Sequence, residues 1–598
     1  MSEPRKLETG TCFALRMQGT IMVPMAFFNR TRFRRTIHRD IAPDEIFLDS
    51  SNLPGHNVAT FEGRVERPVS ARAILGVGIF FLCVVLGYTA RAYTLQVVYG
   101  ADYAEASRAN ALRRSVIFAA RGIIYDRTGR EIAWNETATT SLSSATTASS
   151  TFALRRYAAV PGLSHILGFV QYPKADAKGK WWREAYSGMA GAELTFDASL
   201  AGKNGSRLVE TDARHRVERE NIVVPPVPGQ ERHLSIDAAV QSKLYEVMSA
   251  HAERNNFQGG AAVIIDVRTG EIIALTSFPE YDNTAFTDGV REVVSTQSVS
   301  PRTPLIDRAI SGLYTPGSIV KPLFAAAALN EGVISPYTQI NSVGQLAIPN
   351  PYNPDQPSIF RDWTVHGLVD MRTAIAVSSD EYFYTIGGGF GGQRGLGITK
   401  IDEYARRFGL GAVTGIALAG EKAGVIPTPA WKAEAFPDDP TWRLGNTYHT
   451  SIGQYGFQVT PLQAARFVAA IANGGFLLEP HIVASSTPVK TPVGIPDEYL
   501  QVVREGMRLA VTSDRRDATA KGVYIAGIEM AAKTGTAQIG TANQWMNSWS
   551  VGFWPASNPR YAYAAVLEKA PAGTLSGATP GIRPFFEWLI REHPEYVE

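Results

Sequence analysis

A serine and a lysine three residues apart are the first pair in this sequence whose types and spacing could do covalent chemistry. Pro316 and Gly317 precede Ser318, and apolar helix formers follow Lys321. This pattern predicts a helix that begins near the serine, so that both side chains share one face. A serine hydroxyl needs a base beside it, and a lysine can be that base if burial and positive neighbours lower its pKa. Amide groups at the helix start could stabilise an oxyanion.

A second lysine, near the C-terminus, begins the run Lys533-Thr534-Gly535-Thr536 on a predicted strand. A glycine in a strand lets a substrate backbone approach closely, and a lysine beside threonine hydroxyls can hold a carboxylate. The run therefore predicts a binding edge for an acidic or peptide substrate.

Between these runs lies Ser378-Ser379-Asp380. A Ser-x-Asp alone says little, because residues 235–237 match it too and are typical of a helix cap. A lone Ser-x-x-Lys is also more often a surface lysine near a cap. Here, however, Ser-x-x-Lys and Lys-Thr-Gly each occur once. Their order around the Ser-x-Asp matches the signature of serine acyl transferases.

The whole chain limits the class of protein. Its 598 residues carry a net charge of only +2, which gives no reason to expect nucleic-acid binding, since that needs a concentrated basic face. Two cysteines, Cys12 and Cys83, are too few for a disulfide framework or a cysteine-based zinc site. Residues 73–90 are uncharged, fenced by Arg72 and Arg91, and long enough for a membrane-spanning helix. Positive charges gather on the N-terminal side of this segment, which predicts a cytoplasmic N-terminus.

Composition then divides the chain. We predict a disordered cytosolic tail over residues 1–71, a transmembrane helix over 72–92, a second region over 93–228 and a catalytic domain over 229–598. The Pro/Gly-rich stretch 223–230 marks the last boundary. Strands over 260–277, a buried helix over 318–332 and three late strands predict an α+β fold, with an antiparallel sheet covered by helices.

The three motifs resemble those of penicillin-binding proteins and serine β-lactamases. Further stretches are similar to the class B penicillin-binding proteins, and in particular to their elongation-type, penicillin-binding protein 2-like branch. They are residues 121–129, 188–194, 234–241, 445–454 and 460–463. The resemblance implies a penicillin-binding (transpeptidase) fold after a mostly β pedestal, which residues 93–228 would form in shortened shape.

The resemblance also implies an activity, that of a peptidoglycan DD-transpeptidase inhibited by β-lactams. Ser318 would attack the D-Ala–D-Ala bond of a stem peptide with unprotonated Lys321 as its base. Ser378 would pass a proton to the leaving D-Ala, and Asp380 would line the site. Lys533, Thr534 and Gly535 would shape the cleft. Thr536 would contact the substrate carboxylate, and the amides of Ser318 and Thr536 would form the oxyanion hole.

Partners and location follow from the same resemblance. It implies a single-pass protein of the plasma (inner) membrane with an extracytoplasmic catalytic domain. Its partners would be peptidoglycan stem peptides with lipid-linked nascent glycan, a polytopic glycosyltransferase of the shape, elongation, division and sporulation (SEDS) family, other cell-elongation proteins and β-lactam antibiotics. No cofactor is implied. Some relatives carry a cysteine at the middle position of the second motif and bind zinc nearby. Ser379 stands there in this chain, so we expect no metal.

Several alternatives stay open on the sequence alone. The chain could be a division-type transpeptidase, a catalytically silent scaffold for a glycosyltransferase, or a β-lactam sensor or hydrolase. The intact set of motifs argues against a scaffold, and the long N-terminal half argues against a sensor. Water could also replace the acceptor amine, which would give a carboxypeptidase. The run Gln454-Tyr455-Gly456 has one residue more than the Gly-Gln-Gly usual in the family.

Overall fold

The computed structural model describes residues 70–597, except for residues 137–151, 178–179, 212–216, 351–352, 354 and 484–487. The predicted tail lies outside the described residues up to position 69. The chain divides into two compact units, Met1–Tyr103 and Ala104–Glu598.

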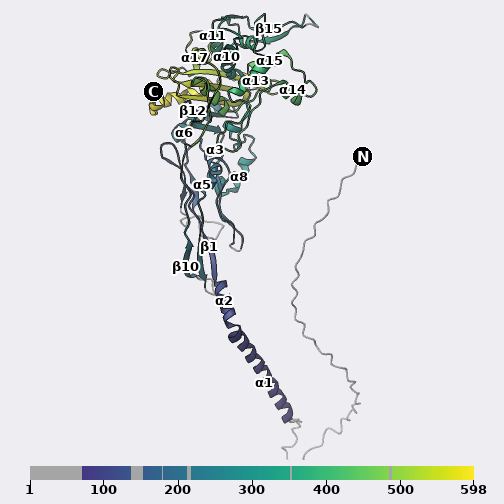
Figure 1. Cartoon of the computed structure of the whole chain (residues 1–598), viewed down its shortest axis with the longest axis vertical. Coiled ribbons are helices and arrows are strands. Elements are labelled where there is room, and N and C mark those ends of the chain that lie inside the picture. Colours follow the sequence, from purple (N-terminus) through teal and green to yellow (C-terminus); the bar gives the residue numbers. More distant parts are fainter. Residues whose placement is uncertain are drawn as a thin grey trace, which may run out of the picture. The chain divides into compact units, whose positions relative to one another are not determined.

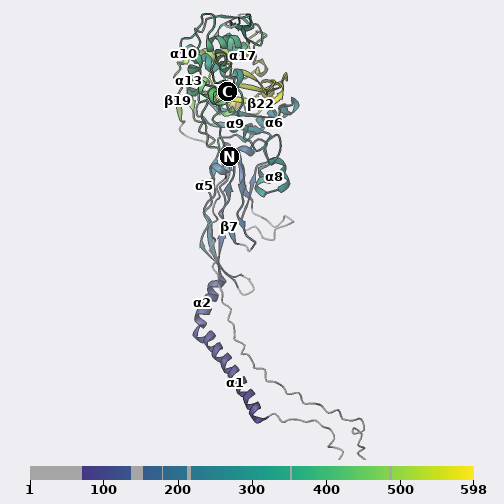
Figure 2. The same ribbon diagram turned by 90° about the vertical axis from the view of Figure 1, so that its right-hand side faces the viewer.

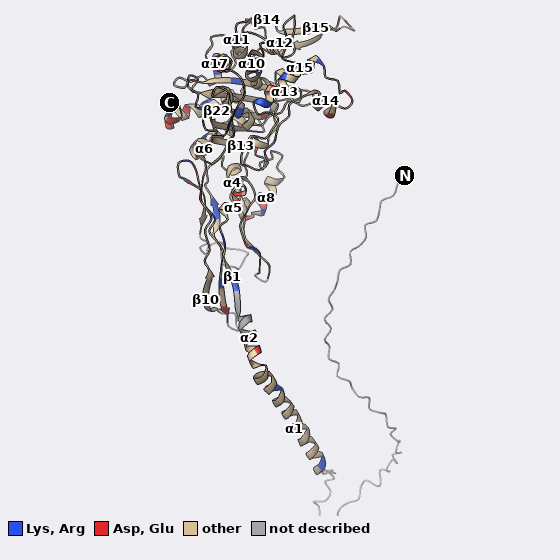
Figure 3. Ribbon diagram, in the orientation of Figure 1, with Lys and Arg blue, Asp and Glu red and all other residues tan. Residues whose placement is uncertain are grey.

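The first unit contains a long apolar helix. α1 (Ala71–Tyr93) continues through a π-helical stretch, η4 (Thr94–Val98), and α2 (Gly100–Ala111) follows. The Oγ of Ser70 accepts a hydrogen bond from the Ala73 amide and caps α1. Figure 3 shows α1 as an uncharged ribbon over nearly its whole length. In the described part of the chain, residues 71–98 are the one helix long and apolar enough to cross a membrane. The predicted apolar helix is thus confirmed, and it extends beyond residue 92.

Small sheets make up the pedestal region. β1, β9 and β10 form one antiparallel sheet, β11, β2, β3 and β4 form a second, and β5–β8 and β6–β7 are two-stranded. The strands are β1 (Leu112–Ile117), β2 (Ile124–Tyr125), β3 (Glu131–Glu136), β4 (Leu154–Tyr157), β5 (Val170–Gln171), β6 (Lys174–Ala175), β7 (Trp181–Arg183), β8 (Ser187–Gly188), β9 (Gly205–Thr211), β10 (Val217–Val224) and β11 (Arg232–His233). The short helices are α3 (Ser164–Leu167), α4 (Gly191–Thr195) and α5 (Asp197–Leu200).

The strands on either side of the turn at residues 126–129, β2 and β3, are antiparallel neighbours. The preceding strand does not join them. β1 pairs with β9 instead, since the chain between β1 and β2 is bonded elsewhere. The Ala119 amide donates to Asn204 Oδ1, and the Gly122 amide donates to the Leu200 carbonyl.

A buried cluster of charged side chains joins separate segments of the pedestal. Glu193 accepts from Arg121 Nε at 2.5 Å and from Arg155 Nε at 2.7 Å, and none of the three side chains has exposed surface. Arg121 also contacts Asp197 at 2.7 Å. Arg121 thus has a second anion in Asp197, whereas Glu193 is the one carboxylate that pairs with Arg155 among the described residues.

We expect Glu193→Gln to destabilise the pedestal by about 3–5 kcal/mol, because it leaves the buried guanidinium of Arg155 without its anion. Thermal unfolding of the full chain in detergent should show the pedestal transition at a lower temperature. Glu136→Gln is the matched control in the same region. Glu136 pairs with Arg156 at 3.0 Å but is 58% exposed, so its loss should change stability by less than about 1 kcal/mol. Equal effects from the two variants would contradict the charge-compensation argument.

A five-stranded antiparallel sheet forms the centre of the catalytic domain, in the order β13-β12-β22-β21-β20. Its strands are β12 (Gly259–Asp266), β13 (Ile272–Phe278), β20 (Ala531–Ile539), β21 (Trp545–Trp554) and β22 (Tyr561–Pro571). Successive residues of one strand enter different cores: Val263 packs in one cluster and Ile264 in the other. Both faces of the sheet are therefore covered, and the predicted α+β architecture is confirmed.

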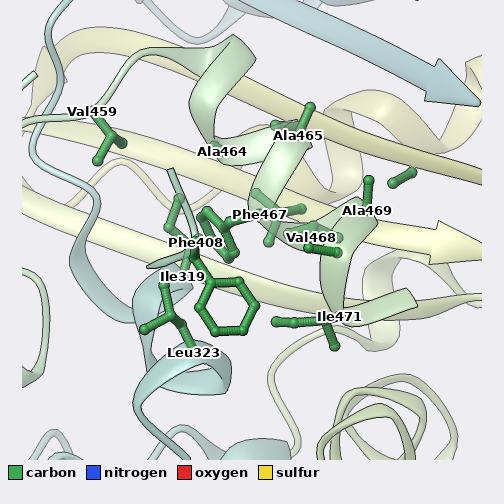
Figure 4. Packing of buried hydrophobic residues seen from close by; sticks show 14 of the residues in the cluster. Ile319, Leu323, Phe408, Val459, Ala464, Ala465, Phe467, Val468, Ala469 and Ile471 are labelled. Atoms are coloured by element: carbon green, nitrogen blue, oxygen red, sulfur yellow. The ribbon is translucent and has the colours of Figure 1, made fainter. Parts of the chain in front are cut away.

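Helices cover each face. α6 (Ala238–Arg254) and α18 (Ala578–Glu592) pack on one face, and α16 (Pro461–Ala472) packs on the other against β12, β21 and β22. Figure 4 shows Phe467 and Ile471 of α16 gathered with Ile319, Leu323 and Phe408 over the sheet. The segment that carries the candidate nucleophile thus rests on the core of the domain.

A second helical layer surrounds this segment. It includes α10 (Lys321–Asn330), α11 (Met371–Val377), α12 (Asp380–Gly388), α13 (Gly397–Arg407), α15 (Leu444–Ser451) and α17 (Asp497–Thr512). α10 packs against α11, α12, α13 and α17, and α10 and α17 lie next to one another in Figures 1 and 2. The predicted helix over 318–332 is buried, but it begins as a 3-10 turn, η5 (Gly317–Val320), and ends at Asn330.

The remaining elements lie at the periphery and between these layers. They are α7 (Asn283–Asp288), α8 (Arg291–Ser298), α9 (Arg308–Ser311), β14 (Ile340–Ser342), β15 (Gln345–Ile348), β16 (Ser358–Arg361), β17 (Gly367–Val369), α14 (Pro429–Ala435), β18 (Phe476–Leu478), β19 (Lys490–Pro492), η6 (Lys521–Val523) and η7 (Pro594–Tyr596).

Candidate active site

The serine of the first motif lies in the 3-10 turn that leads into α10. Ser318 is the second residue of η5, and Lys321 is the first residue of α10. Pro322 follows in the first helical turn, where a missing amide hydrogen is tolerated. Lys321 has no exposed surface, whereas Ser318 is partly exposed. The turn therefore presents the hydroxyl outward and keeps the amine in the interior.

Two glycines let this turn approach the edge strand β20. Gly317 has a φ of +56°, and a Cβ built there would lie 2.8 Å from the carbonyl oxygen of Thr536. A Cβ on Gly535 would lie 2.8 Å from the side chain of Ile319. Any larger residue at either position would push the strand and the turn apart. The glycines of the first and third motifs therefore bring the nucleophile segment against β20.

A cavity of about 330 Å³ opens where these segments meet. Its lining residues come from all three motifs and from two other segments: Ser318, Trp363, Ser378, Asp380, Thr519, Thr534 and Thr536. The side chains of Thr534 and Thr536 share it because alternate residues of a strand face the same side. The cavity thus unites hydroxyl groups with one carboxylate, while both motif lysines are fully buried.

Lys321 links the first motif to the second. Its Nζ donates to the carbonyl oxygen of Ser378 at 2.7 Å and to Asp380 Oδ1 at 2.6 Å, and it lies 3.3 Å from Ser378 Oγ. Asp380 is 20% exposed and the lysine is not exposed at all. The amine is therefore held in one position by contacts with residues nearly sixty positions away in the chain.

The second motif forms a two-residue link between helices. Ser378 ends α11 in the left-handed conformation, with a φ of +59°. Ser379 then caps α12, since its Oγ accepts from the Tyr382 amide. The link turns the Ser378 hydroxyl and the Asp380 carboxylate into the same cavity. A left-handed serine is strained, and such strain is concentrated at functional sites.

Lys533 lies under the floor of the cavity. Its Nζ donates to the carbonyl oxygen of Thr534 at 3.0 Å. Burial, and then the positive charge of Lys321, lower the pKa of Lys533 well below its usual value, and the carboxylate of Asp380 opposes them. The third motif therefore contributes a lysine that is driven toward its neutral form beside the lysine of the first motif.

The structure brings together every residue that the motifs predict: Ser318, Lys321, Ser378, Asp380, Lys533, Thr534, Gly535 and Thr536. Sequence reasoning missed two residues of the cavity wall, Trp363 and Thr519. Trp363 Nε1 donates to the carbonyl oxygen of Val377 at 3.1 Å, which fixes the indole beside the second motif. Neither residue stands in a motif with chemical spacing, so no local signal could have identified it.

Among the described residues, no three His, Cys, Asp or Glu side chains are arranged to hold a metal ion. The carboxylate nearest to Ser379 is that of Asp362, and it already accepts from Ser379 Oγ at 2.7 Å and from the Glu381 amide at 3.0 Å. The expectation that no metal is needed stays a prediction.

Comparison with known proteins decides the family. The model of the penicillin-binding protein transpeptidase domain matches residues 260–587, and that of the penicillin-binding protein dimerisation domain matches residues 148–234. The chain belongs to the penicillin-binding protein transpeptidase family. The transpeptidase match covers all three motifs and the whole sheet, except for the first residue of β12.

Relatives place the chain within this family. It is 29% identical to the peptidoglycan D,D-transpeptidase MrdA of Escherichia coli K12 over 602 aligned residues, which cover 84% of this chain and 91% of that one. The chain is a class B penicillin-binding protein of the PBP2/MrdA type, a serine-type peptidoglycan D,D-transpeptidase.

Two solved structures support the same family assignment. PBP2 of Pseudomonas aeruginosa, in complex with WCK 5153, superimposes with a TM-score of 0.61 at 29% identity and covers 81% of this chain and 100% of its own. A chain from a peptidoglycan synthase complex that coordinates polymerization and crosslinking gives a TM-score of 0.65 at 27% identity, covering 86% of this chain and 97% of its own.

Proposed function

We propose that Ser318 is the nucleophile of this transpeptidase and that Lys321 is its general base. The convergence of Ser318, Ser378, Thr534 and Thr536 on one cavity, with buried Lys321 bonded to the second motif, carries this proposal. Of the two motif serines that line the cavity, Ser318 is partly exposed and Ser378 is buried, so Ser318 is the one open to an incoming peptide. Lys321, three residues further along the chain, is the group that can accept its proton.

The other motif residues have separate roles in the remaining steps of the reaction. Ser378, whose Oγ lies 3.3 Å from Lys321 Nζ, passes the proton to the leaving D-Ala. Asp380 holds the lysine in place. Thr534 and Thr536 bind the substrate carboxylate, and Gly535 keeps β20 close to the nucleophile turn. The amides of Ser318 and Thr536 form the oxyanion hole, which the close approach at Gly317 supports. An amine of a second stem peptide then attacks the acyl-enzyme.

Lys533 has an electrostatic role in this scheme. It is fully buried next to Lys321 and close to Asp380. Burial and the positive charge of Lys321 drive Lys533 toward its neutral form. We infer that Lys533, together with Thr534, shapes the cleft and its electric field.

The proposal extends to the whole chain. Residues 1–71 are a cytosolic tail, 72–92 a single membrane span, 93–228 the pedestal and 229–598 the transpeptidase domain, in the plasma membrane with the catalytic domain outside. β11 lies after residue 228, in the proposed transpeptidase domain, but it pairs with pedestal strand β2. One pedestal sheet therefore includes a strand from beyond the boundary at residue 228. The apolar helix α1 and the likeness to PBP2 proteins support this arrangement.

The proposed partners are stem peptides on lipid-linked nascent glycan, a SEDS-type glycosyltransferase and other cell-elongation proteins. The likeness to a chain of a peptidoglycan synthase complex supports the glycosyltransferase partner. β-Lactams are the proposed covalent inhibitors. A silent scaffold would have no need of the strained Ser378 or of a buried lysine at the cavity, so we favour catalysis.

We expect the full-length protein to cross-link nascent glycan when it is incubated with lipid-linked precursor and a glycosyltransferase. Muropeptide analysis by mass spectrometry should find cross-linked dimers that disappear after penicillin treatment or in Ser318→Ala. Monomers that have only lost the terminal D-Ala would show a carboxypeptidase instead. Unchanged peptides alongside polymerised glycan would show a scaffold.

A further inference from the structure

A buried histidine stands between two carboxylates beside the active-site cavity. His366 Nδ1 lies 2.8 Å from Asp517 Oδ2, and its Nε2 lies 3.5 Å from Asp362 Oδ1. The side chains of His366 and Asp362 have no exposed surface. Arg515 donates to both carboxylate oxygens of Asp517 and to the carbonyl oxygen of His366. We call these four residues the histidine clamp.

The clamp joins three segments that each supply residues to the cavity wall. Asp362 is followed directly by the lining residue Trp363, and Asp517 precedes the lining residue Thr519 by two positions. The third segment is the second motif. Asp362 Oδ2 accepts from Ser379 Oγ at 2.7 Å and from the Glu381 amide at 3.0 Å. One carboxylate thus holds the residues on both sides of Asp380.

The segment held in this way is the strained one. Ser378 is left-handed, and a non-glycine residue keeps that conformation only where the surroundings fix it. Inside the cavity, Lys321 fixes it by donating to the Ser378 carbonyl oxygen. Outside the cavity, Asp362 fixes it through Ser379. The clamp is therefore the second of two attachments that keep Ser378 and Asp380 aimed at the nucleophile.

The charge on the clamp depends on one proton. A neutral imidazole carries a single N–H, whereas the protonated ring carries one on each nitrogen. Nδ1 is hydrogen-bonded to Asp517, and Nε2 approaches Asp362 only as a possible ion pair at 3.5 Å, without a hydrogen-bond partner among the described residues. Burial alone would lower the pKa of His366, but the carboxylates of Asp362 and Asp517 outweigh it and raise that pKa. Burial alone would likewise raise the pKa of Asp362, but its hydrogen-bond donors and Lys321 hold that pKa below its usual range.

We propose that protonated His366 is a positioning residue that holds the Ser378–Asp380 segment ready for acylation of Ser318. The proposal rests on the proposed function, because acylation is its readout. His366 does not line the cavity and acts only through Asp362 and Asp517.

Other charged groups lie near the clamp and act on the pKa values of its residues. Glu381 approaches Asp362, and burial first of all raises the pKa of that glutamate. The charged and titratable groups around His366, directly or through Asp362, are Asp362, Asp517, Arg515, Glu381 and Lys321.

The sign of the pH effect follows from the raised pKa. The charged clamp is complete at pH values below the ordinary pKa of histidine. It weakens as the pH rises through the higher value that His366 has in the folded protein. Loss of the proton removes the attraction for at least one of the two carboxylates and loosens the second motif.

The test is the rate at which a fluorescent penicillin acylates the full-length protein, compared between wild type and His366→Gln across a pH range of about 5 to 9. Glutamine keeps a neutral donor but cannot titrate. The ratio of the two rates cancels the titration of the Ser318 and Lys321 machinery. We expect the wild-type rate divided by the His366→Gln rate to be on the order of 10 to 100 at the acidic end, as for other small misplacements of reacting groups. The ratio should fall toward one as the pH rises.

Two further variants sharpen the test. His593→Gln removes a histidine that pairs with Glu595 at 2.9 Å in a more exposed place, and its ratio should stay near one at every pH. Asp517→Asn removes one of the two anions and so lowers the pKa of His366. The acylation rate of Asp517→Asn should therefore begin to fall at a lower pH than that of the wild type. This shift can be measured even if His366→Gln does not fold.

The outcomes are distinct. A ratio near one throughout, or a constant ratio at all pH values together with an unshifted profile for Asp517→Asn, would overturn the charged clamp while leaving Ser318 as the nucleophile. No acylation of the wild type at any pH would overturn the proposed function and the clamp with it.

Discussion

Ser318→Ala should lose covalent labelling by penicillin completely, because no other serine in the described cavity has both an exposed position and a lysine three residues on. Fluorescent penicillin followed by gel electrophoresis measures the loss. Mass spectrometry of the drug-treated wild type should place the adduct on Ser318 and on no other residue. The geometry supports this expectation, since η5 presents Ser318 to the cavity while α10 buries Lys321.

Ser335→Ala provides the matched control for this experiment. Ser335 follows the same helix, and its hydroxyl pairs with that of Thr338 on the surface. Its replacement should leave labelling unchanged. An adduct on another residue of the wild type, or no adduct at saturating drug, would refute Ser318 as the nucleophile.

Lys321→Arg should lower the acylation rate by about 10²- to 10⁴-fold at every accessible pH, which is the usual contribution of a general base. A free lysine has a pKa near 10.4 and must give up its proton to act as a base, and a guanidinium cannot do so. Lys321→His should keep a trace of activity, because imidazole titrates near neutrality but is shorter.

The contacts of Lys321 make this substitution informative. Its Nζ lies 2.6 Å from Asp380 Oδ1, and an arginine could still form that ion pair. If the lysine only orients Ser318 and Asp380 by charge, Lys321→Arg should keep substantial activity. That result would refute the general-base role and leave Ser318 as the nucleophile.

The control is a second buried lysine with an acidic partner. Lys432 is 2% exposed and lies 3.2 Å from Asp439. Lys432→Arg introduces the same change in shape far from the three motifs in sequence, and its acylation rate should match that of the wild type. Thermal unfolding of both variants shows whether the larger side chain disturbs the fold.

Much of the site could be predicted because each motif is local. Ser318 and Lys321 are joined by a single turn, and Thr534 and Thr536 share a face because strand residues alternate. The apolar segment in α1 and the strands β12, β13, β20, β21 and β22 also follow from local patterns of hydrophobicity. The sequence therefore determined which residues belong to each motif and which elements carry them.

Tertiary structure alone decided how the motifs meet. Lys321 contacts Asp380 because α10 packs against α11 and α12, and no spacing in the chain encodes that packing. Trp363 and Thr519 reach the cavity, and His366 pairs with Asp517 beside it, from segments that are separated by some 150 residues. The pairing of β1 with β9 likewise depends on bonds made by the chain that follows β1. Local periodicity records how a residue sits on its own helix or strand, whereas the contacts between distant segments come from the closest packing of the whole core.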